Sequence, residues 1–301
     1  MKVLFQNRRK DLWVGGDYIQ LEKTAEALRK LGVEVDISEE YVVKPEVITQ
    51  YDIVHLWNFS MEWSKFQLWV ARKHKKPVVC SMIYHENDQF IPYNFQQIML
   101  DELSAQIYLT ESEKKRVDRH LISNTPRYVI PNGIDNFWFK DTKLQKEDKV
   151  LTVGRIEPSK GQLAVALACN KLGVEYYCAG EVRDEEYAKQ IEDAGGVLLG
   201  NLEPDKLIQW YAVCKVFALV SKAEVFPLTV MEAMAQNCQI VLTNTSEWKP
   251  DVLFADYHDE NSIYKALKEA FEQEKDYQSF VKQYTWEEVA KQLLEIYKKL
   301  C

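Results

Sequence analysis

Two basic residues in the second half of the chain, Arg155 and Lys160, have a spacing that could hold a diphosphate. They lie in the segment Val-Gly-Arg-Ile-Glu-Pro-Ser-Lys-Gly over 153–161, which follows an apolar run and opens a pattern of helical period. Ligands of open α/β sheets bind beyond the carboxyl ends of the strands, and a helix start attracts anions. Two cations placed there would neutralise a diphosphate. A capped helix with two surface cations explains the spacing equally well.

Two acidic residues, Glu224 and Glu232, are separated by seven residues that include Phe226 and Pro227. Proline suits the first turn of a helix, so the amides of residues 227–229 would be free to bind an anion. An ionised carboxylate accepts two hydrogen bonds and therefore suits a vicinal diol. We expect Glu224 to hold sugar hydroxyls and Glu232 the hydroxyls of a ribose. The alternative is two surface glutamates on an amphipathic helix, which the apolar Ala-Met-Ala after Glu232 disfavours.

Other motifs for phosphates and metals are absent from the sequence. It contains no G-x-G, no G-x-x-x-x-G-K-[ST] and no D-x-D, the acidic pair with which metal-dependent sugar transferases hold a divalent ion. The five histidines lack metal-binding spacing, and none of the six cysteines lies in a C-x-x-C pair. We therefore expect no metal and no cofactor. Cysteines within apolar runs indicate buried free thiols of a cytoplasmic protein.

The elements that must position these residues alternate between short apolar runs and segments of helical period. An apolar run at 3–5, a loop, a helical face over 21–31 and an alternating run at 33–37 form a β-α-β unit, which predicts a parallel sheet. Further strands are predicted at 53–56, 78–84, 106–110, 127–130, 150–153, 174–179, 197–199, 216–220 and 240–243, and helices most clearly at 161–172, 204–213 and 227–236.

The length and the pattern indicate an α/β protein of two Rossmann-like domains. The chain has 301 residues, 47% of them hydrophobic, and a polar stretch without periodicity separates two series of elements. We expect an N-terminal domain over 1–135, a linker over 136–149 and a second domain over 150–284.

Composition excludes several classes of protein. Charged residues make up 28% of the chain and the net charge is −8, so wrapping of duplex nucleic acid is disfavoured. No stretch is apolar enough for a membrane helix or a secretory leader. Residues 1–135 contain 18 basic and 19 acidic groups, and the remainder contains 20 and 27, so the second half carries most of the negative charge.

Basic and aromatic residues gather in the first half of the chain. Basic runs at 72–76 and 114–116 favour solvated helix faces, with an anionic acceptor or membrane headgroups as the functional alternative. Phe59, Trp63, Phe66 and Val70 share one helical stripe, which predicts core packing, whereas Trp57 and Trp69 lie off that stripe and are candidates for an acceptor groove.

Taken together, the motifs resemble those of the retaining nucleotide-sugar glycosyltransferases of family four, which have the GT-B fold. The two glutamates with Phe-Pro between them resemble the family's E-x7-E signature. Segment 153–161 is similar to its V-G-R-x4-K-G, and segment 131–135, Pro-Asn-Gly-Ile-Asp, to its interdomain motif. Further segments that resemble family loops, in family order along the chain, are 13–16, 179–181, 199–202 and 284–287. The family's G-x-P after the signature helix and its glycine-rich loop are missing here, replaced by 236–239 and 244–248.

The resemblance implies a fold and a set of roles. Two Rossmann-like domains would face each other across a cleft, and a closing helix over 285–301 would return to the N-terminal domain. Arg155 and Lys160 would neutralise the leaving diphosphate, and Glu224 would hold the transferred sugar. The remaining donor contacts would come from Gly16 and Leu202, from the backbone of Phe226, Pro227, Leu228 and Thr229, and from Glu232. His85 would face the sugar and the acceptor.

The resemblance also implies the reaction. We expect metal-independent transfer of a sugar from a UDP- or GDP-sugar to a hydroxyl acceptor with retention of configuration. The acceptor could be a glycan, a lipid-linked sugar, a small molecule or a modified nucleic-acid base, with at most weak peripheral contact to a membrane. Two alternatives remain: a non-catalytic nucleotide-sugar-binding subunit, and another GT-B enzyme such as a nucleotide-sugar epimerase or a phosphorylase.

Overall fold

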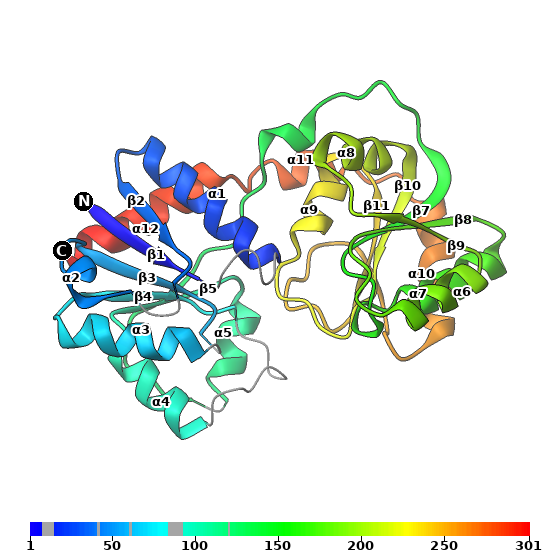
Figure 1. The fold of residues 1–301 in the computed structure, drawn as a ribbon. Helices are drawn as coiled ribbons and strands as arrows, with labels where there is room; N and C mark the ends of the chain where they lie inside the picture. The colour runs from blue at the N-terminus through cyan, green and yellow to red at the C-terminus, as the bar shows by residue number, and fades with distance from the viewer. Residues whose placement is uncertain (8–14, 41–42, 60–61, 84–92, 120) are drawn as a thin grey trace. The chain divides into compact units, whose positions relative to one another are not determined.

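The computed structural model describes residues 1–7, 15–40, 43–59, 62–83, 93–119 and 121–301. It divides into two compact units. Unit 1 comprises residues 1–133 and 284–301, and unit 2 comprises residues 134–283. Each unit has its own sheet of parallel strands with helices on both faces, which is the α/β architecture predicted from the alternation of apolar runs and helical patterns (Figure 1).

The described residues of unit 1 form a six-stranded sheet in the order β2-β1-β3-β4-β5-β6. Its strands are β1 Lys2–Gln6, β2 Glu34–Ser38, β3 Ile53–Trp57, β4 Val78–Ser81, β5 Ala105–Tyr108 and β6 Arg127–Val129. One face is covered by α1 (Gly16–Lys30) and α12 (Trp286–Leu300), and the other by α3 (Glu62–Lys73), α4 (Tyr93–Glu102) and α5 (Glu111–Val117). A short helix, α2 (Pro45–Ile48), precedes β3.

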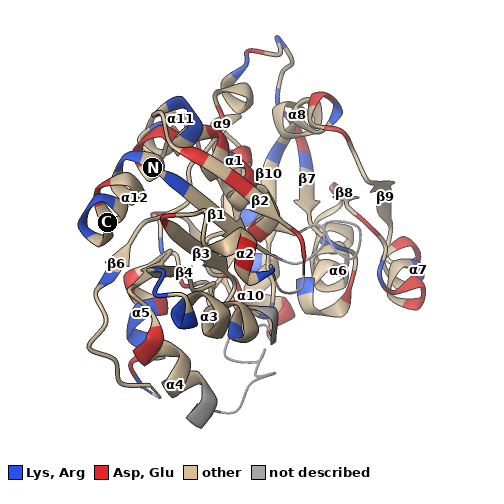
Figure 2. Cartoon of the chain, turned by 60° about the vertical axis from the view of Figure 1, so that its left-hand side comes forward, with Lys and Arg blue, Asp and Glu red and all other residues tan. Residues whose placement is uncertain are grey.

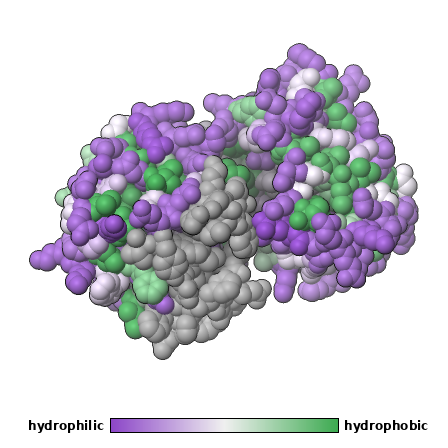
Figure 3. Space-filling model, in the orientation of Figure 1, coloured by the Kyte–Doolittle hydropathy of each residue, from purple (hydrophilic) through white to green (hydrophobic). Residues whose placement is uncertain are grey.

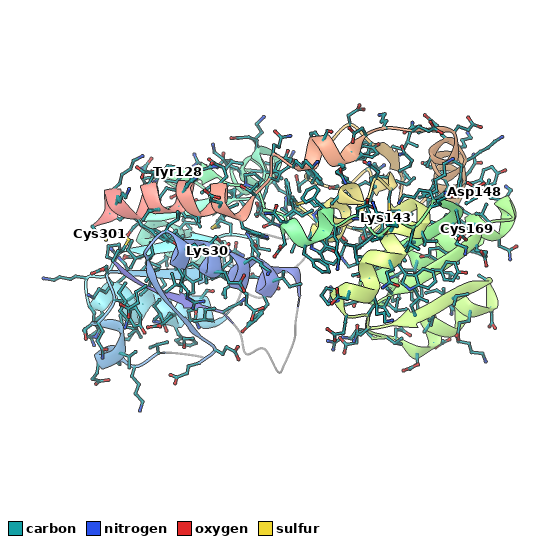
Figure 4. All side chains as sticks on the ribbon, turned by 90° about the horizontal axis from the view of Figure 1, so that it is seen from above. Lys30, Tyr128, Lys143, Asp148, Cys169 and Cys301 are labelled. Atoms are coloured by element: carbon teal, nitrogen blue, oxygen red, sulfur yellow. The ribbon has the colours of Figure 1, made fainter. Side chains whose placement is uncertain are left out.

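The last helix packs onto unit 1 through a buried polar contact. The hydroxyl of Tyr297 on α12 lies 2.5 Å from Nδ1 of His55 on β3, and Nε2 of His55 lies 3.0 Å from Oγ of Ser81. Burial lowers the pKa of His55 to about 3, so the ring is neutral. At the end of α12, the ammonium of Lys299 lies 5.8 Å from the ring centroid of Tyr128 on β6. Figure 4 shows Tyr128 beside α12. These contacts account for the return of the chain to unit 1.

Unit 2 has the strand order β12-β11-β10-β7-β8-β9, with all strands parallel. The strands are β7 Glu147–Val153, β8 Glu175–Ala179, β9 Gly196–Gly200, β10 Cys214–Leu219, β11 Gln239–Thr243 and β12 Leu253–Ala255. One face carries α6 (Gln162–Leu172), α7 (Glu185–Asp193) and α10 (Glu260–Glu272); the other carries α8 (Pro204–Val213), α9 (Leu228–Ala235) and α11 (Tyr277–Val281). Short turns of 3-10 helix occupy Asn136–Phe139 and Pro158–Lys160.

Most predicted strands are present, but some boundaries differ from the predicted ones. β7 begins at Glu147, inside the stretch predicted as a linker, because charged residues at the exposed start of the strand hide its apolar pattern. β4 ends at Ser81 rather than at residue 84. β12 is three residues long and was not predicted, since so short a strand has no readable period.

The aromatic stripe predicted in the first half of the chain is only partly buried. Phe59 and Val70 are buried, but Phe66 on α3 is 44% exposed, so the prediction of core packing is wrong for that residue. Trp57 is 1% exposed because it lies inside β3, which excludes it from a surface groove. Trp69 is 64% exposed. Helix α3 begins only at Glu62, so Phe59 does not share its period.

No helix among the described residues is long and apolar enough to span a membrane. All six cysteines have free thiols, and five of them are buried.

Candidate active site

The predicted diphosphate residues lie where the strand order of unit 2 reverses. β8 and β9 extend the sheet on one side of β7, and β10, β11 and β12 extend it on the other. In an open α/β sheet, the loops after the two strands at such a point leave in opposite directions and open a crevice that binds ligands. Here these loops are 154–161, after β7, and 220–227, after β10.

The two loops touch each other through their backbones. The amide of Lys222 donates to the carbonyl of Ser159 over 2.8 Å. Gly161 has φ +70, and a Cβ atom built on it would lie 2.1 Å from the carbonyl oxygen of Val220. Only glycine permits this approach, because any side chain would collide with the facing backbone. The glycine that ends segment 153–161 therefore brings Lys160 next to the loop after β10.

The close approach of the loops joins Lys160 to Glu224. Nζ of Lys160 donates to Oε1 of Glu224 over 2.7 Å, and the two side chains are only 19% and 12% exposed. A charge-assisted hydrogen bond of this length is strong where water is largely excluded. The structure thus brings together two predicted site residues to which we had assigned separate ligands.

The second predicted cation also has an acidic partner. The guanidinium of Arg155 lies 3.3 Å from Oε1 of Glu157, and the hydroxyl of Ser159 donates to the same oxygen over 2.6 Å. Arg155 and Lys160 are thus each paired with a carboxylate. A ligand carrying two negative charges would therefore compete with Glu157 and Glu224 for these cations.

The helix start differs from the prediction in one respect. Helix α9 begins at Leu228, and Pro227 is its N-cap with φ −71 and ψ 121. Proline has no N–H, so it cannot be an anion donor, and the amides at the helix start are those of Leu228, Thr229 and the residue after them. Leu228 and Thr229 are half-buried, whereas Phe226 is buried and stacks on Trp248 with ring centroids 4.3 Å apart.

Glu232 lies further along α9 and carries a perturbed carboxyl group. The hydroxyl of Tyr211 on α8 donates to its Oε2 over 2.8 Å. Burial raises the pKa of Glu232 to about 7, and the hydrogen bond from Tyr211 opposes that rise. The carboxyl group is therefore poised to change its charge near neutral pH, which is a common property of functional sites.

The loops after β8 and β9 belong to the same edge of the sheet. The amide of Gly154 donates to the carbonyl of Ala179 over 2.9 Å, and that of Gly180 donates to the carbonyl of Gly200 over 2.8 Å. Leu202, the predicted base contact, lies two residues beyond β9 and is half-buried. These contacts extend the candidate site from β10 to β9.

Two predicted residues come from unit 1. Gly16 is the first residue of α1 and is exposed. His85 lies outside the described residues.

Three residues of this site were missed by the sequence analysis. Glu157 lies inside a predicted motif and could have been singled out as the acid nearest to Arg155. Tyr211 is 21 residues from Glu232, and no local spacing connects them. The backbone amide of Trp248 donates to the carbonyl of Val225 over 3.0 Å, and this hydrogen bond connects the loop after β11 to the loop after β10. This contact depends on the sheet order and has no local signal.

The described residues contain no group of three or more His, Cys, Asp or Glu side chains that could hold a metal ion.

Comparison with known families identifies the class of protein. Residues 134–299 match the model of the family described as glycosyl transferases group 1. The match covers more than half of the chain, and the chain therefore belongs to this family, whose members are transferases.

Solved structures support the same fold at low sequence identity. HepE of Anabaena, solved in complex with UDP and glucose, is 14% identical, with a TM-score of 0.79 over 99% of this chain and 100% of that one. Sucrose-phosphate synthase of Thermosynechococcus elongatus is 15% identical, with a TM-score of 0.79 over 99% and 98% of the two chains. The lipopolysaccharide outer core galactosyltransferase WaaB, in its apo form, is 12% identical, with a TM-score of 0.73 over the whole of both chains. The fold is therefore GT-B. No curated protein matches the chain in sequence.

Proposed function

We propose that the protein is a metal-independent, retaining glycosyltransferase of family four that transfers a sugar from a UDP- or GDP-sugar to a hydroxyl group. The transferase class follows from family membership. The single observation that carries the finer proposal is the Lys160–Glu224 ion pair at the reversal of the strand order, 2.7 Å long and largely shielded from water. The pair places a cation next to a carboxylate. A sugar phosphate needs both, because its phosphate binds a cation and its hydroxyl groups donate to a carboxylate.

In this proposal the ion pair lies beside the bond that breaks. The diphosphate oxygens bind Lys160, the sugar hydroxyls donate to Glu224, and the bond between sugar and phosphate lies between these two contacts. As the bond breaks, negative charge grows on the departing phosphate, and Lys160 and Arg155 stabilise it. Stabilisation of charge that develops in the transition state is usually a large contribution to catalysis.

The rest of the donor is held along α9 and the neighbouring loops. The amides of Leu228 and Thr229 donate to the distal phosphate, which the positive end of the helix also attracts. The ribose hydroxyls donate to Glu232. The base lies against the backbone around Leu202, and Gly16 is assigned to the phosphates by the resemblance, since a side chain there would collide with them.

Retention of configuration follows in this proposal from attack on the same face of the sugar from which the diphosphate leaves. The departing phosphate oxygen takes the proton of the acceptor hydroxyl, so no side chain is named as general base. The resemblance assigns His85 to the sugar and the acceptor. The acceptor carries a hydroxyl group on a glycan, a lipid-linked sugar, a small molecule or a modified nucleic-acid base, and we place the reaction in the cytoplasm with no more than peripheral membrane contact.

The experiment is to incubate the purified chain with a panel of UDP- and GDP-sugars and to measure release of the nucleoside diphosphate, with and without a chelator. We expect slow hydrolysis of one donor that the chelator leaves unchanged and that retains the anomeric configuration. Binding of a donor without any release would favour a non-catalytic subunit. A changed sugar that stays attached to the nucleotide would favour an epimerase, and a requirement for a divalent metal would contradict the metal-independent mechanism.

A further inference from the structure

Large apolar side chains are exposed on one face of α3 in unit 1. Phe66 is 44% exposed and Trp69 is 64% exposed, whereas Gln67 and Leu68 between them are buried. Residues three apart on a helix lie on the same face, so the two rings form an outward-facing pair. Neither ring contributes to the core of the unit.

The neighbouring helix adds further exposed apolar groups. Ile98 on α4 is 61% exposed, and Ile122 is 81% exposed. The amide of Ile122 donates to the side-chain carbonyl of Gln97 on α4 over 2.9 Å, which places Ile122 beside that helix. α3 and α4 are joined at their C-terminal ends by the Arg72–Glu102 ion pair, 3.0 Å long.

We call Phe66, Trp69, Ile98 and Ile122, with the basic residues around them, the α3–α4 surface. The first three residues come from helices on one face of the sheet (Figure 1), and the four side chains are among the ten large apolar ones that the described part of the chain exposes. On the face in view in Figure 3, hydrophilic residues predominate and hydrophobic ones form small patches among them. Apolar groups gathered on one side of a soluble unit commonly mark an interaction surface.

The α3 part of this surface is basic as well as apolar, whereas α4 carries the acidic residues Asp101 and Glu102 and no basic residue. Segment 62–76 contains five basic residues and one acidic residue in a chain whose net charge is −8, and Figure 2 shows Lys and Arg along α3. Nζ of Lys65 lies 5.0 Å from the ring centroid of Phe66, and Nζ of Lys73 lies 5.1 Å from that of Trp69. The two ammonium groups thus lie over the aromatic rings, in the range of a cation–π contact.

We propose that the α3–α4 surface docks on an anionic lipid bilayer. Phenylalanine, tryptophan and lysine on one helix, with exposed isoleucines on the neighbouring elements, resemble the composition of a helix that lies in the membrane interface. Lysine and arginine near the surface add attraction to anionic headgroups. A second copy meeting the surface through a twofold axis centred on α3 would bring the two basic segments against each other, so the charge of α3 favours the bilayer.

The proposal is independent of the transfer reaction, because none of its residues is among those of the candidate active site. The side chains that enter the interface are those of Phe66, Trp69, Ile98 and Ile122, and the lipid headgroups are anionic. The test therefore uses the purified full chain without any donor, so that its failure leaves the proposed function standing.

The experiment is flotation with vesicles of phosphatidylcholine alone or mixed in equal parts with phosphatidylglycerol. We expect binding to the mixed vesicles only, and release at high salt because ions screen the headgroups. Trp69→Ser should lower the partition coefficient about tenfold, since the side chain would no longer enter the interface. Phe66→Ser provides a second variant, and Lys73→Glu with Lys75→Glu should abolish the preference for phosphatidylglycerol.

Matched controls come from unit 2. Val197 on β9 is 46% exposed, so Val197→Ser removes a similarly exposed apolar group elsewhere, and Lys189→Glu reverses an exposed charge on α7. Both controls should bind vesicles like the wild type. Equal binding to both kinds of vesicle, or unchanged binding by the Trp69 and Phe66 variants, would overturn the proposal. A dimer in sedimentation that Trp69→Ser dissociates would overturn it too, because a second copy would then cover the surface.

Discussion

The ammonium of Lys160 and the carboxylate of Glu224, 64 positions apart in the chain, form a 2.7 Å ion pair in unit 2. The pair exists because β7 and β10 are neighbours and because the loops that follow them are in backbone contact. A pair of this kind satisfies both groups when no ligand is present, and removing one partner leaves the other partly buried without compensation.

Replacing Lys160 by alanine should reduce kcat/KM for donor hydrolysis by at least about tenfold, which corresponds to about 1.4 kcal/mol of transition-state stabilisation. The loss should appear in kcat as well as in KM, because the charge on the departing diphosphate is largest in the transition state. Lys189→Ala removes an exposed lysine of α7 and serves as the control. Equal kcat/KM values for wild type and Lys160→Ala would disprove the assigned role.

Gly161→Ala should destabilise unit 2 more than Gly173→Ala does. Both glycines have nearly the same left-handed backbone, with φ of +70 and +72, but only the first faces an obstacle, the carbonyl oxygen of Val220 at 2.1 Å. The backbone conformation alone costs alanine about 1–2 kcal/mol in both variants, and the collision should add about 1–3 kcal/mol to the first. Urea unfolding of the two variants measures the difference, and identical midpoints would mean that the loop contact is not tight in solution.

Binding of UDP should strengthen as pH rises through about 7, the pKa to which burial raises Glu232. Only the ionised carboxylate accepts hydrogen bonds from both ribose hydroxyls. Calorimetric titration at a series of pH values checks this, with Glu232→Gln as the control that should bind weakly at every pH. Tyr211→Phe removes the hydrogen bond that lowers this pKa, so the midpoint should move to higher pH. A midpoint that stays in place would exclude Glu232 as the titrating group.

The same carboxyl group should make the folded state less stable as pH rises. The pKa of Glu232 is higher in the folded state than the ordinary value of 4.5. Its favourable contribution to the free energy of unfolding is therefore fully present below about pH 4.5, and it is lost as pH rises through about 7. Linkage gives a loss of up to about 3 kcal/mol over this range. The measurement is the difference between the free energies of unfolding of wild type and Glu232→Gln. Comparing this difference near pH 4.5 and above pH 7 isolates the contribution of the Glu232 carboxyl group. A constant difference would contradict the raised pKa.

Trp248→Ala should destabilise the protein by about 3–5 kcal/mol, in the range found for truncating buried aromatic residues. Trp248 is 7% exposed and stacks on Phe226 immediately before α9. Trp69→Ala removes the same side chain from an exposed position and should change the free energy of unfolding by less than about 0.5 kcal/mol. Equal effects of the two substitutions on thermal unfolding would mean that the stacked pair does not support the start of α9.

The sequence was sufficient to predict the alternation of strands and helices and the loops that carry the candidate site. Strand β7 and the loop after it were predictable because an apolar run, a glycine and two cations lie within a few residues of one another. Local patterns could not reveal that Lys160 bonds to Glu224 or that Tyr211 bonds to Glu232, since both contacts depend on which strands and helices become neighbours.

The predictions for Pro227 and Phe66 were wrong because a local sequence pattern allows more than one placement of each residue. Pro227 fits the first turn of a helix by its chemistry, but the last residue before a helix also accepts proline, and only the backbone angles distinguish the two positions. Phe66 has the right spacing for a core stripe, but periodicity does not tell which face of α3 meets the sheet. The basic residues that follow on the same helix were the available signal that this face is exposed.

The return of α12 to unit 1 has a consequence for how the protein is made. Residues 134–283, the whole of unit 2, are synthesised before Tyr297, which meets His55, its partner 242 positions earlier. Unit 2 contains no part of α12 and can therefore close its core without it, while one face of the sheet in unit 1 is not yet covered by α12. A released chain truncated after residue 283 should show a protease-resistant second unit attached to a first unit that is readily cleaved.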